Sequence, residues 1–582
     1  MERAAIFIGV KRAGDLPELQ AVTSGVQRMM TWAHSQRIPD DRIMVLTDEA
    51  GEVRAYQISD AIEKIVGLTT VEQLIIYFSG HGVNNRGEYW LLSRAPGNAN
   101  EAVNVEGSVT LARYCGIGHV VLISDACRTA AEGIQAQNIT GSEIFPNEPG
   151  GGLEQPVDVF FACARGNPAF EVKDPVNAAS QFSGIYTEIL AECLNGRCAD
   201  VLDYEDEGGA KTGLVRPRKL RDYLRVSVSK RLSQKLGHAP TINQTPDARI
   251  VSDNTWLSRI PGLSRAAIPP IRVSRATAVD PFTISEALVS SALDGNLDHW
   301  RNVLSVAGGL PEALPLRDAA ATYAAPFAAP FGRDHFENIC GFKLRGTNAA
   351  QAYCGEATTR ILDADGRNIR VGNMSQPGVS VLIELRNGTG VLVPSIPDFV
   401  AELTFEDGQL ANLSYEPSSN SWRWGEYADR QEELRTLRAS VAASAGFGVF
   451  RLSGDDAIKL ARRMQFAKGV DPSLALYAAY AYHDLQRRDL IREMESYLRA
   501  DLGWAFFDIA LLSGNLPDPG RNRVLPPFPM LSQGWTLLSA FGVKLPNSLQ
   551  QLQRHLLPAL WTMFDHGGVA MLAAAIHSGE VR

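Results

Sequence analysis

The sequence contains no apolar run of the roughly 18 residues that a membrane-spanning helix requires. Its opening residues, Met1 to Val10, are too short and wrongly built for a signal peptide, and they predict a first strand instead. We therefore expect no membrane partner.

An excess of basic charge and a regular cysteine spacing are also missing. The net charge is -9, so no strong basic field indicates a nucleic-acid partner. The seven cysteines are an odd number and lack the spacing of metal ligands. Cys193 and Cys198 lie five residues apart, but neither a second pair nor a histidine follows them closely. We therefore expect no disulfide framework, no metal and no cofactor, and a reducing, cytoplasmic location.

What remains is the composition of an ordinary soluble globular protein, 45% hydrophobic and 21% charged. Within residues 1–258, short apolar runs alternate with helical patterns, which predicts an α/β fold with a mostly parallel sheet between helices. We expect strands at 4–9, 43–47, 73–78, 88–92, 119–124 and 157–163, and helices at 18–36, 55–66, 181–194 and 217–236.

The pattern changes after this first domain. Residues 259–334 predict a linker, rich in proline, arginine and alanine at its start, with a helical segment at 283–305. Residues 335–424 predict a small antiparallel β domain, and residues 427–582 an α-helical bundle or repeat-like domain. The β domain is indicated by turn signals between β-prone runs, at Asp365-Gly366, Asn387-Gly388 and Asp407-Gly408.

Two short apolar runs in the first domain are each followed by a residue of reactive chemistry. Residues 74–78 lead into His81, and residues 120–123 lead into Cys127. Runs of this kind predict buried strands of a parallel sheet, and loops at the carboxyl ends of such strands are where open α/β sheets form their sites. A cysteine and a histidine together can act as a nucleophile and its acid/base partner.

The segments around these two residues resemble the caspase-like cysteine peptidases: caspases, metacaspases and their bacterial relatives. Residues 77–82 read Tyr-Phe-Ser-Gly-His-Gly, and residues 125–128 read Asp-Ala-Cys-Arg. His81 precedes Cys127 by 46 residues, close to the spacing of about 50 in caspases. The resemblance covers residues 1–258 and implies a caspase-like sandwich with endopeptidase activity on protein or peptide substrates.

The chemistry expected of the pair follows from its residue types. Cys127 attacks a peptide carbonyl, while His81 accepts the thiol proton and later protonates the leaving amine. The resemblance implies that the backbone N–H groups of Gly82 and Cys127 form the oxyanion hole. Cys163 also ends an apolar run, but it lacks a Gly-His-Gly partner, and we interpret it as structural.

The residue two positions before the nucleophile bears on specificity. Animal caspases carry glutamine there and prefer acidic residues, whereas this chain has Asp125. In metacaspase-like relatives an aspartate at this place lines a pocket for arginine or lysine. The resemblance thus implies Asp125 as the floor of the S1 pocket, with Glu171 as a second candidate, because a desolvated carboxylate favours a cationic partner. Alternatively, Asp125 caps a following helix, and both roles can hold together.

Three functions remain open on these grounds. The first is a cytoplasmic cysteine endopeptidase whose carboxyl-terminal domains bind a protein regulator or partner. Such an arrangement in bacterial relatives suggests a role in bacterial stress or defence signalling for this protein. The second is a catalytically inactive caspase-like scaffold, although a scaffold needs neither His81 nor Cys127. The third is another acyl-transfer enzyme, such as a ligase, that uses the same residues.

Overall fold

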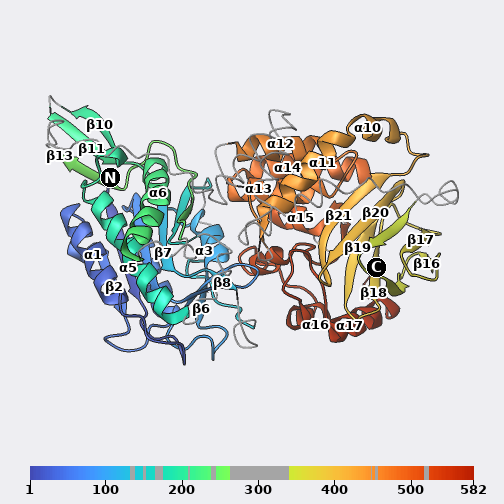
Figure 1. Cartoon of the computed structure of the whole chain (residues 1–582), viewed down its shortest axis with the longest axis horizontal. Helices are drawn as coiled ribbons and strands as arrows, with labels where there is room; N and C mark the ends of the chain where they lie inside the picture. The colour runs from blue at the N-terminus through green and yellow to red at the C-terminus, as the bar shows by residue number, and fades with distance from the viewer. Residues whose placement is uncertain are drawn as a thin grey trace. The chain divides into compact units, whose positions relative to one another are not determined.

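The chain forms two compact units, Met1–Ala278 and Val279–Arg582, in a computed structural model (Figure 1). The helical segment expected at 283–305 lies outside the described residues, as does most of the expected linker. The structure describes residues 1–130, 138–147, 153–163, 175–207, 210–236, 244–261, 340–446, 449–452, 456–516 and 523–581.

The first unit is built on a six-stranded sheet of order β12-β9-β7-β3-β1-β2. Every neighbouring pair is parallel except β12 with β9, which confirms the expected mostly parallel sheet. Strands β3 and β7 are buried along their whole length, as strands covered on both faces should be. The strands are β1 (Arg3–Gly9), β2 (Ile43–Thr47), β3 (Gln73–Gly80), β7 (His119–Ala126), β9 (Val157–Phe161) and β12 (Asp247–Arg249).

Helices α1 (Val22–Ser35), α5 (Pro175–Leu194) and α6 (Pro217–Leu236) lie side by side over one face of this sheet (Figure 1). Because side chains alternate across a strand, odd-numbered residues of β3 and β7 point toward these helices. Tyr77 and Ile123 accordingly belong to the core that the helices share with the sheet. Helix α2 (Ala55–Val66) packs against β1 and β2 outside that core.

Two small sheets complete the first unit. One has the order β6-β5-β4-β8 and contains the chain segments that follow β3 and β7. Its strands are β4 (Gly82–Asn84), β5 (Glu88–Leu91), β6 (Ala102–Asn104) and β8 (Thr129–Ala130), and helix α3 (Val105–Ala112) follows β6. The other joins β10 (Leu202–Glu207), β11 (Ala210–Val215) and β13 (Ser258–Pro261).

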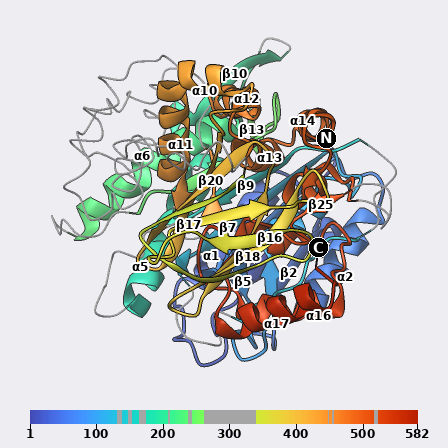
Figure 2. The same ribbon diagram turned by 90° about the vertical axis from the view of Figure 1, so that its right-hand side faces the viewer.

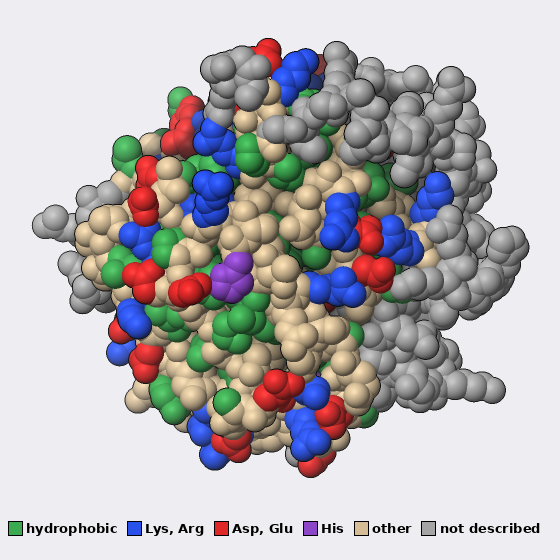
Figure 3. Space-filling model, turned by 90° about the vertical axis from the view of Figure 1, so that its left-hand side faces the viewer, with side chains coloured by type: hydrophobic (Ala, Val, Ile, Leu, Met, Phe, Trp, Pro, Cys, Tyr) green, Lys and Arg blue, Asp and Glu red, His purple; other side chains and the backbone are tan. Residues whose placement is uncertain are grey.

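On the face that Figure 3 shows, acidic and basic side chains are interspersed. Neither sign gathers into a continuous patch among the described residues of this face, in keeping with the modest net charge of the chain. None of the described helices combines the length and the hydropathy that crossing a bilayer would require.

The second unit contains the expected hairpins. Gly366, Gly388 and Gly408 adopt φ of 74°, 83° and 79°, the left-handed region for which glycine suits these turns. One expectation was wrong: β14 and β20 are parallel, so the strands do not form a purely antiparallel domain. The strands are β14 (Gly341–Arg345), β15 (Ala349–Tyr353), β16 (Thr358–Ile361), β17 (Asn368–Gly372), β18 (Val379–Leu385), β19 (Gly390–Ser395), β20 (Phe399–Glu406) and β21 (Gln409–Pro417).

Helices follow the strands, and α17 returns to pack against β18 and β19 (Figure 2). Helix α13 is buried on all sides rather than on the single face that its apolar spacing indicates. The helices are α10 (Trp424–Asp429), α11 (Gln431–Ser444), α12 (Ala457–Ala467), α13 (Leu474–Asp484), α14 (Arg488–Leu502), α15 (Phe507–Ser513), α16 (Asn547–Gln551) and α17 (His566–His577); the short strands β22 (Ala445–Gly446), β23 (Val449–Phe450), β24 (Ala505–Phe506) and β25 (Val524–Leu525) lie among them.

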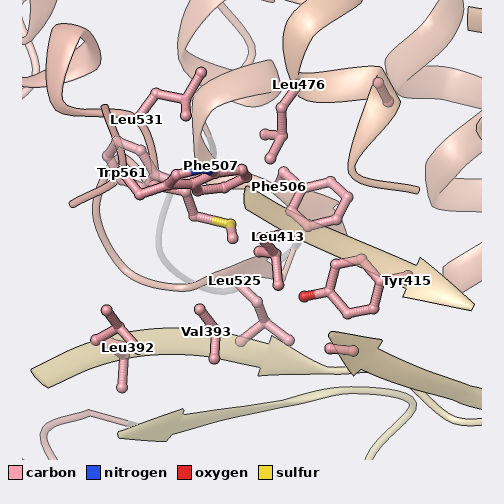
Figure 4. Packing of buried hydrophobic residues seen from close by; sticks show 14 of the residues in the cluster. Leu392, Val393, Leu413, Tyr415, Leu476, Phe506, Phe507, Leu525, Leu531 and Trp561 are labelled. Carbon is pink, nitrogen blue, oxygen red and sulfur yellow. The ribbon is translucent and has the colours of Figure 1, made fainter. Parts of the chain in front are cut away.

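Strands and helices of the second unit share one hydrophobic core, which runs from Cys340 to Val581. In Figure 4, Val393 of β19 and Tyr415 of β21 face Leu476 of α13 and Phe506 of β24 across this core. The regions that the sequence presents as a β domain and a helical domain therefore bury their apolar surfaces against each other.

Candidate active site

His81 and Cys127 occupy neighbouring positions at the carboxyl end of the main sheet. Strands β3 and β7 pair in parallel up to Gly80 and Ala126, whose numbers differ by 46. Strands β4 and β8 then pair in parallel with the same difference, beginning at Val83 and Thr129. The constant offset on both sides indicates that the backbone of His81 lies opposite that of Cys127.

The imidazole of His81 is held by a backbone carbonyl. Its Nε2 lies 2.8 Å from the carbonyl oxygen of Pro17. A carbonyl oxygen can only accept, so Nε2 carries the proton and Nδ1 keeps its lone pair in the neutral ring. Burial lowers the pKa of His81 below its ordinary value, which keeps the ring neutral at physiological pH and so free to accept a proton.

The thiol of Cys127 is half-buried, and burial raises its pKa well above the ordinary value. The nearby Cys163 and Asp125 raise this pKa further, because each, when ionised, disfavours a second negative charge beside it. The resting pair is therefore a neutral thiol beside a neutral imidazole. Nucleophilic attack by this thiol would require a neighbouring base to take up its proton as the sulfur attacks, rather than a thiolate formed in advance.

Only glycine fits at position 82, because the chain there lies close to Ala126 and Cys127. A Cβ at this position would lie 2.5 Å from the carbonyl oxygen of Cys127 and 2.9 Å from the Cβ of Ala126. Both neighbours belong to the segment that carries the thiol, so neither can give way without moving Cys127. The backbone of Gly82 thus approaches the reacting residue closely, as the proposed pair of oxyanion donors requires.

This close approach makes Gly82→Ala a test of the site. We expect kcat on a peptide substrate to fall by about 10²–10³, the usual cost of losing an oxyanion donor. The matched control is Gly184→Ala on α5, where a new Cβ would find Ala21 at an ordinary 3.5 Å. Steady-state kinetics of both folded variants should separate them, and equal losses would contradict the assigned role of Gly82.

Asp125 is fully buried and points toward the helices over the odd-numbered face of the sheet. Its Oδ2 accepts hydrogen bonds from the hydroxyls of Thr187 on α5 and Tyr77 on β3, the latter at 3.2 Å. Its Oδ1 has no partner among the described residues. Burial raises the pKa of Asp125 to about 8, so the carboxyl is largely protonated at neutral pH.

The helix-capping alternative for Asp125 was wrong. The residue lies inside β7, and the chain continues into strand β8 rather than into a helix. Its carboxyl group bonds Thr187 and Tyr77 instead of backbone N–H groups at a helix start. Glu171, the other expected pocket residue, lies outside the described residues.

Sequence reasoning missed the residues that surround Asp125. Ser79 pairs with Asp125 in the β3–β7 register, and the Tyr77 and Thr187 hydroxyls lie 2.8 Å apart. A Cβ added at Gly25 on α1 would lie 2.7 Å from the Tyr77 hydroxyl. The alternation of Tyr77, Ser79 and His81 at every second residue was the available signal, whereas the approach of Thr187 depends on helix packing.

Arg128 links the segment that follows Cys127 to three strands. It is buried, and it donates to Glu88 Oε1 at 2.6 and 2.8 Å and to Asp247 Oδ2 at 2.9 Å. It also donates to the carbonyl oxygen of Cys163, and its guanidinium lies 3.9 Å from the centre of the Phe161 ring. These contacts hold the residue after Cys127 in one place.

We expect Arg128→Met to lower the free energy of unfolding of the first unit by about 3–5 kcal/mol, because Glu88 would stay buried without its cation. Urea denaturation measures this. In the control Arg12→Met, the ion pair with Glu18 is mostly in water, and the loss of stability should be far smaller. Equal losses in the two variants would show that the buried pair has no special role.

Cys163, the rival nucleophile, lies beside the same loop. Its thiol contacts the carbonyl oxygen of Ala126 at 3.6 Å, and burial raises its pKa to about 12. A thiol with so high a pKa is a weak nucleophile unless a base takes its proton. His81 lies across from Cys127 in the register and not from Cys163.

Neither the models of known protein families nor the curated proteins include a match to this sequence. Among solved structures, the chain is similar to the Drosophila initiator caspase Dronc. The likeness is distant, with 9% sequence identity and a TM-score of 0.27, and it covers 42% of this chain and 78% of that chain.

Proposed function

We propose that this protein is a cysteine endopeptidase in which Cys127 is the nucleophile and His81 is the general base and acid. The observation that carries the proposal is the constant register of β3–β4 with β7–β8, which brings the two side chains to adjacent strand ends. The hydrogen bond from His81 Nε2 to the carbonyl oxygen of Pro17 also supports the proposal, because it leaves Nδ1 as the ring atom able to accept a proton.

The reaction proceeds in two steps. Nδ1 of His81 removes the proton of Cys127 as the sulfur attacks the peptide carbonyl carbon, and the oxyanion is met by the N–H groups of Gly82 and Cys127. His81 then gives its proton to the leaving amine, and a thioester remains. Water, deprotonated by the same imidazole, hydrolyses the thioester and restores the thiol.

We further propose cleavage after arginine or lysine, with Asp125 as the group that recognises the basic side chain. Its buried Oδ1 is without a partner among the described residues, which leaves an acceptor for a guanidinium or ammonium group. A cation there would favour the ionised carboxylate and would lower the pKa that burial now raises.

The second unit is proposed to bind a protein regulator or substrate. Its strands and helices share one core, so this unit can present a binding surface that takes no part in the peptidase chemistry.

Fluorogenic peptides that end in arginine, lysine or aspartate test the proposed function on the full chain. We expect turnover of the arginine and lysine peptides to exceed that of the aspartate peptide by at least about 10²-fold, the scale set by leaving a buried charged group unpaired. Preference for aspartate would overturn the role of Asp125 but not that of Cys127. The absence of any turnover, with the active-site thiol shown to be reduced, would favour the inactive scaffold.

A further inference from the structure

Two cysteines remote from the Cys127 thiol lie almost within bonding distance. The sulfur atoms of Cys193 and Cys198 are 2.8 Å apart, and both residues are free thiols buried in the first unit. A disulfide bond brings two sulfur atoms to about 2.05 Å. Oxidation would therefore shorten their separation by only about 0.8 Å.

The fold sets this proximity through the turn that ends α5. Gly196 adopts φ of 75°, and its N–H donates to the carbonyl oxygen of Cys193 at 2.9 Å. The N–H of Arg197 donates back to Glu192 at 3.0 Å, so the chain reverses and returns Cys198 to the helix. A Cβ at Gly196 would lie 2.2 Å from the side chain of Ile260, so the turn is tightly fixed.

The two thiols differ in their surroundings. Cys193 has no exposed surface, and burial raises the pKa of its thiol. Cys198 is 7% exposed, and its pKa is lowered by hydrogen bonds from Cys193 and from the Tyr223 hydroxyl. Cys198 is thus the better nucleophile of the two, and the sulfur that a small reagent reaches first.

We propose that Cys193 and Cys198 form a redox-active dithiol that low-molecular-weight disulfides such as oxidised glutathione convert to an intramolecular disulfide. The Cys198 thiolate attacks one sulfur of the oxidant, forms a mixed disulfide and releases one glutathione thiolate. Cys193 then loses its proton, and its sulfur attacks that of Cys198 and releases the second glutathione. Two electrons pass to the oxidant, which leaves as two molecules of reduced glutathione.

Helix α5 connects this pair of cysteines to the proposed specificity residue. Cys193 lies in the last turn of this helix, and Thr187, which donates to Asp125, lies two turns earlier. A disulfide would fix the end of the helix whose middle supports the proposed specificity residue. The redox reaction itself requires no peptidase activity.

The chain offers a direct mass-spectrometric test, because Arg197 separates the two cysteines. The full protein is equilibrated with excess oxidised glutathione, alkylated in denaturant and digested with trypsin without reduction. We expect residues 174–197 and 198–211 to be recovered as one linked species, which reduction separates into two. Cys340, a buried free cysteine of the second unit and the only cysteine of tryptic peptide 334–343, should be recovered alkylated and serves as the control.

Recovery of both peptides in the alkylated form would overturn the proposal, as would linkage of the Cys127 peptide to the Cys163 peptide in its place. Native-state labelling provides a second measurement that needs no variant. Limiting iodoacetamide should modify Cys198 before Cys193, and the reverse order would contradict the assigned first step. In Cys198→Ser, the peptide of residues 174–197 should be recovered alkylated and unlinked, while its linkage to another cysteine peptide would show that Cys193 pairs with a different thiol.

Discussion

Cys127→Ala is expected to lower kcat/KM for an arginine peptide by a factor on the order of 10⁴ or more, since covalent catalysis then has no nucleophile. The side chain is half-buried and small, so alanine fills most of its space and the fold should persist. Steady-state assays with a fluorogenic peptide measure the loss, and circular dichroism of both proteins checks that the variant is folded.

Cys163→Ala is the matched control for this experiment. Cys163 is also a half-buried free thiol near the same loop, but His81 does not lie across from it. Its replacement should leave kcat/KM within about threefold of the original, as is usual when a contact outside the reaction is trimmed. If Cys163→Ala removed activity and Cys127→Ala did not, the nucleophile would be assigned to the wrong residue.

Asp125→Asn is expected to lower kcat/KM for arginine and lysine peptides by about 10²–10³, because truncating one partner of a buried charge pair costs several kcal/mol. The loss should fall mainly on KM, since the carboxyl group meets the substrate side chain and not the reacting bond. In the unchanged protein, KM for the arginine peptide should fall as the pH rises toward about 8, where the carboxyl of Asp125 ionises. A flat KM over this range would contradict the proposed pocket.

The same substitution should stabilise the first unit. The folded state keeps Asp125 protonated up to a pKa of about 8, while the unfolded chain ionises near 3.8. Between these values the unfolded chain binds fewer protons, so the stability of the first unit decreases as the pH rises through this window. Asparagine has no charge to lose, and its oxygen can still accept from Thr187. We expect a gain on the order of 2–4 kcal/mol at pH 8 by urea denaturation.

Asp508→Asn in the second unit provides the contrasting case. Burial raises the pKa of Asp508 to about 6, but both of its oxygens accept from backbone N–H groups, at Met530 and Leu531. An amide would present N–H to one of these donors, so the variant should lose stability by about 1–3 kcal/mol. A gain in both variants would show that charge alone, and not hydrogen bonding, sets the effect.

Much of the first unit could be predicted because its strands and helices carry clear periodicity. The strand at 43–47 and the helices at 55–66 and 217–236 agree with the structure at both ends. Strands β4 and β8 were not predicted, because segments of two or three residues are too short to show alternation. These two strands continue the register past His81 and Cys127, so only the structure could supply the register from which their juxtaposition is inferred.

Some residues of the candidate site could likewise be predicted from the sequence, and others could not. His81, Cys127 and Asp125 could be identified because each ends a strand or lies near its end. Thr187 could not, because it reaches Asp125 only through the packing of α5 on the sheet, and no local pattern records that contact. The hydrogen bonds of Arg128 could not be predicted either, because they join strands that are distant in sequence.

The core shared by strands and helices in the second unit determines how this part of the chain can be divided. Leu392 and Tyr415 on the strands are buried in the same core as Leu476 of α13 and Trp561. A fragment cut near residue 420 would leave two halves with large apolar surfaces, prone to aggregate rather than fold. Residues 340–581 should accordingly melt in a single cooperative transition, and natural recombination could transfer them only as one piece.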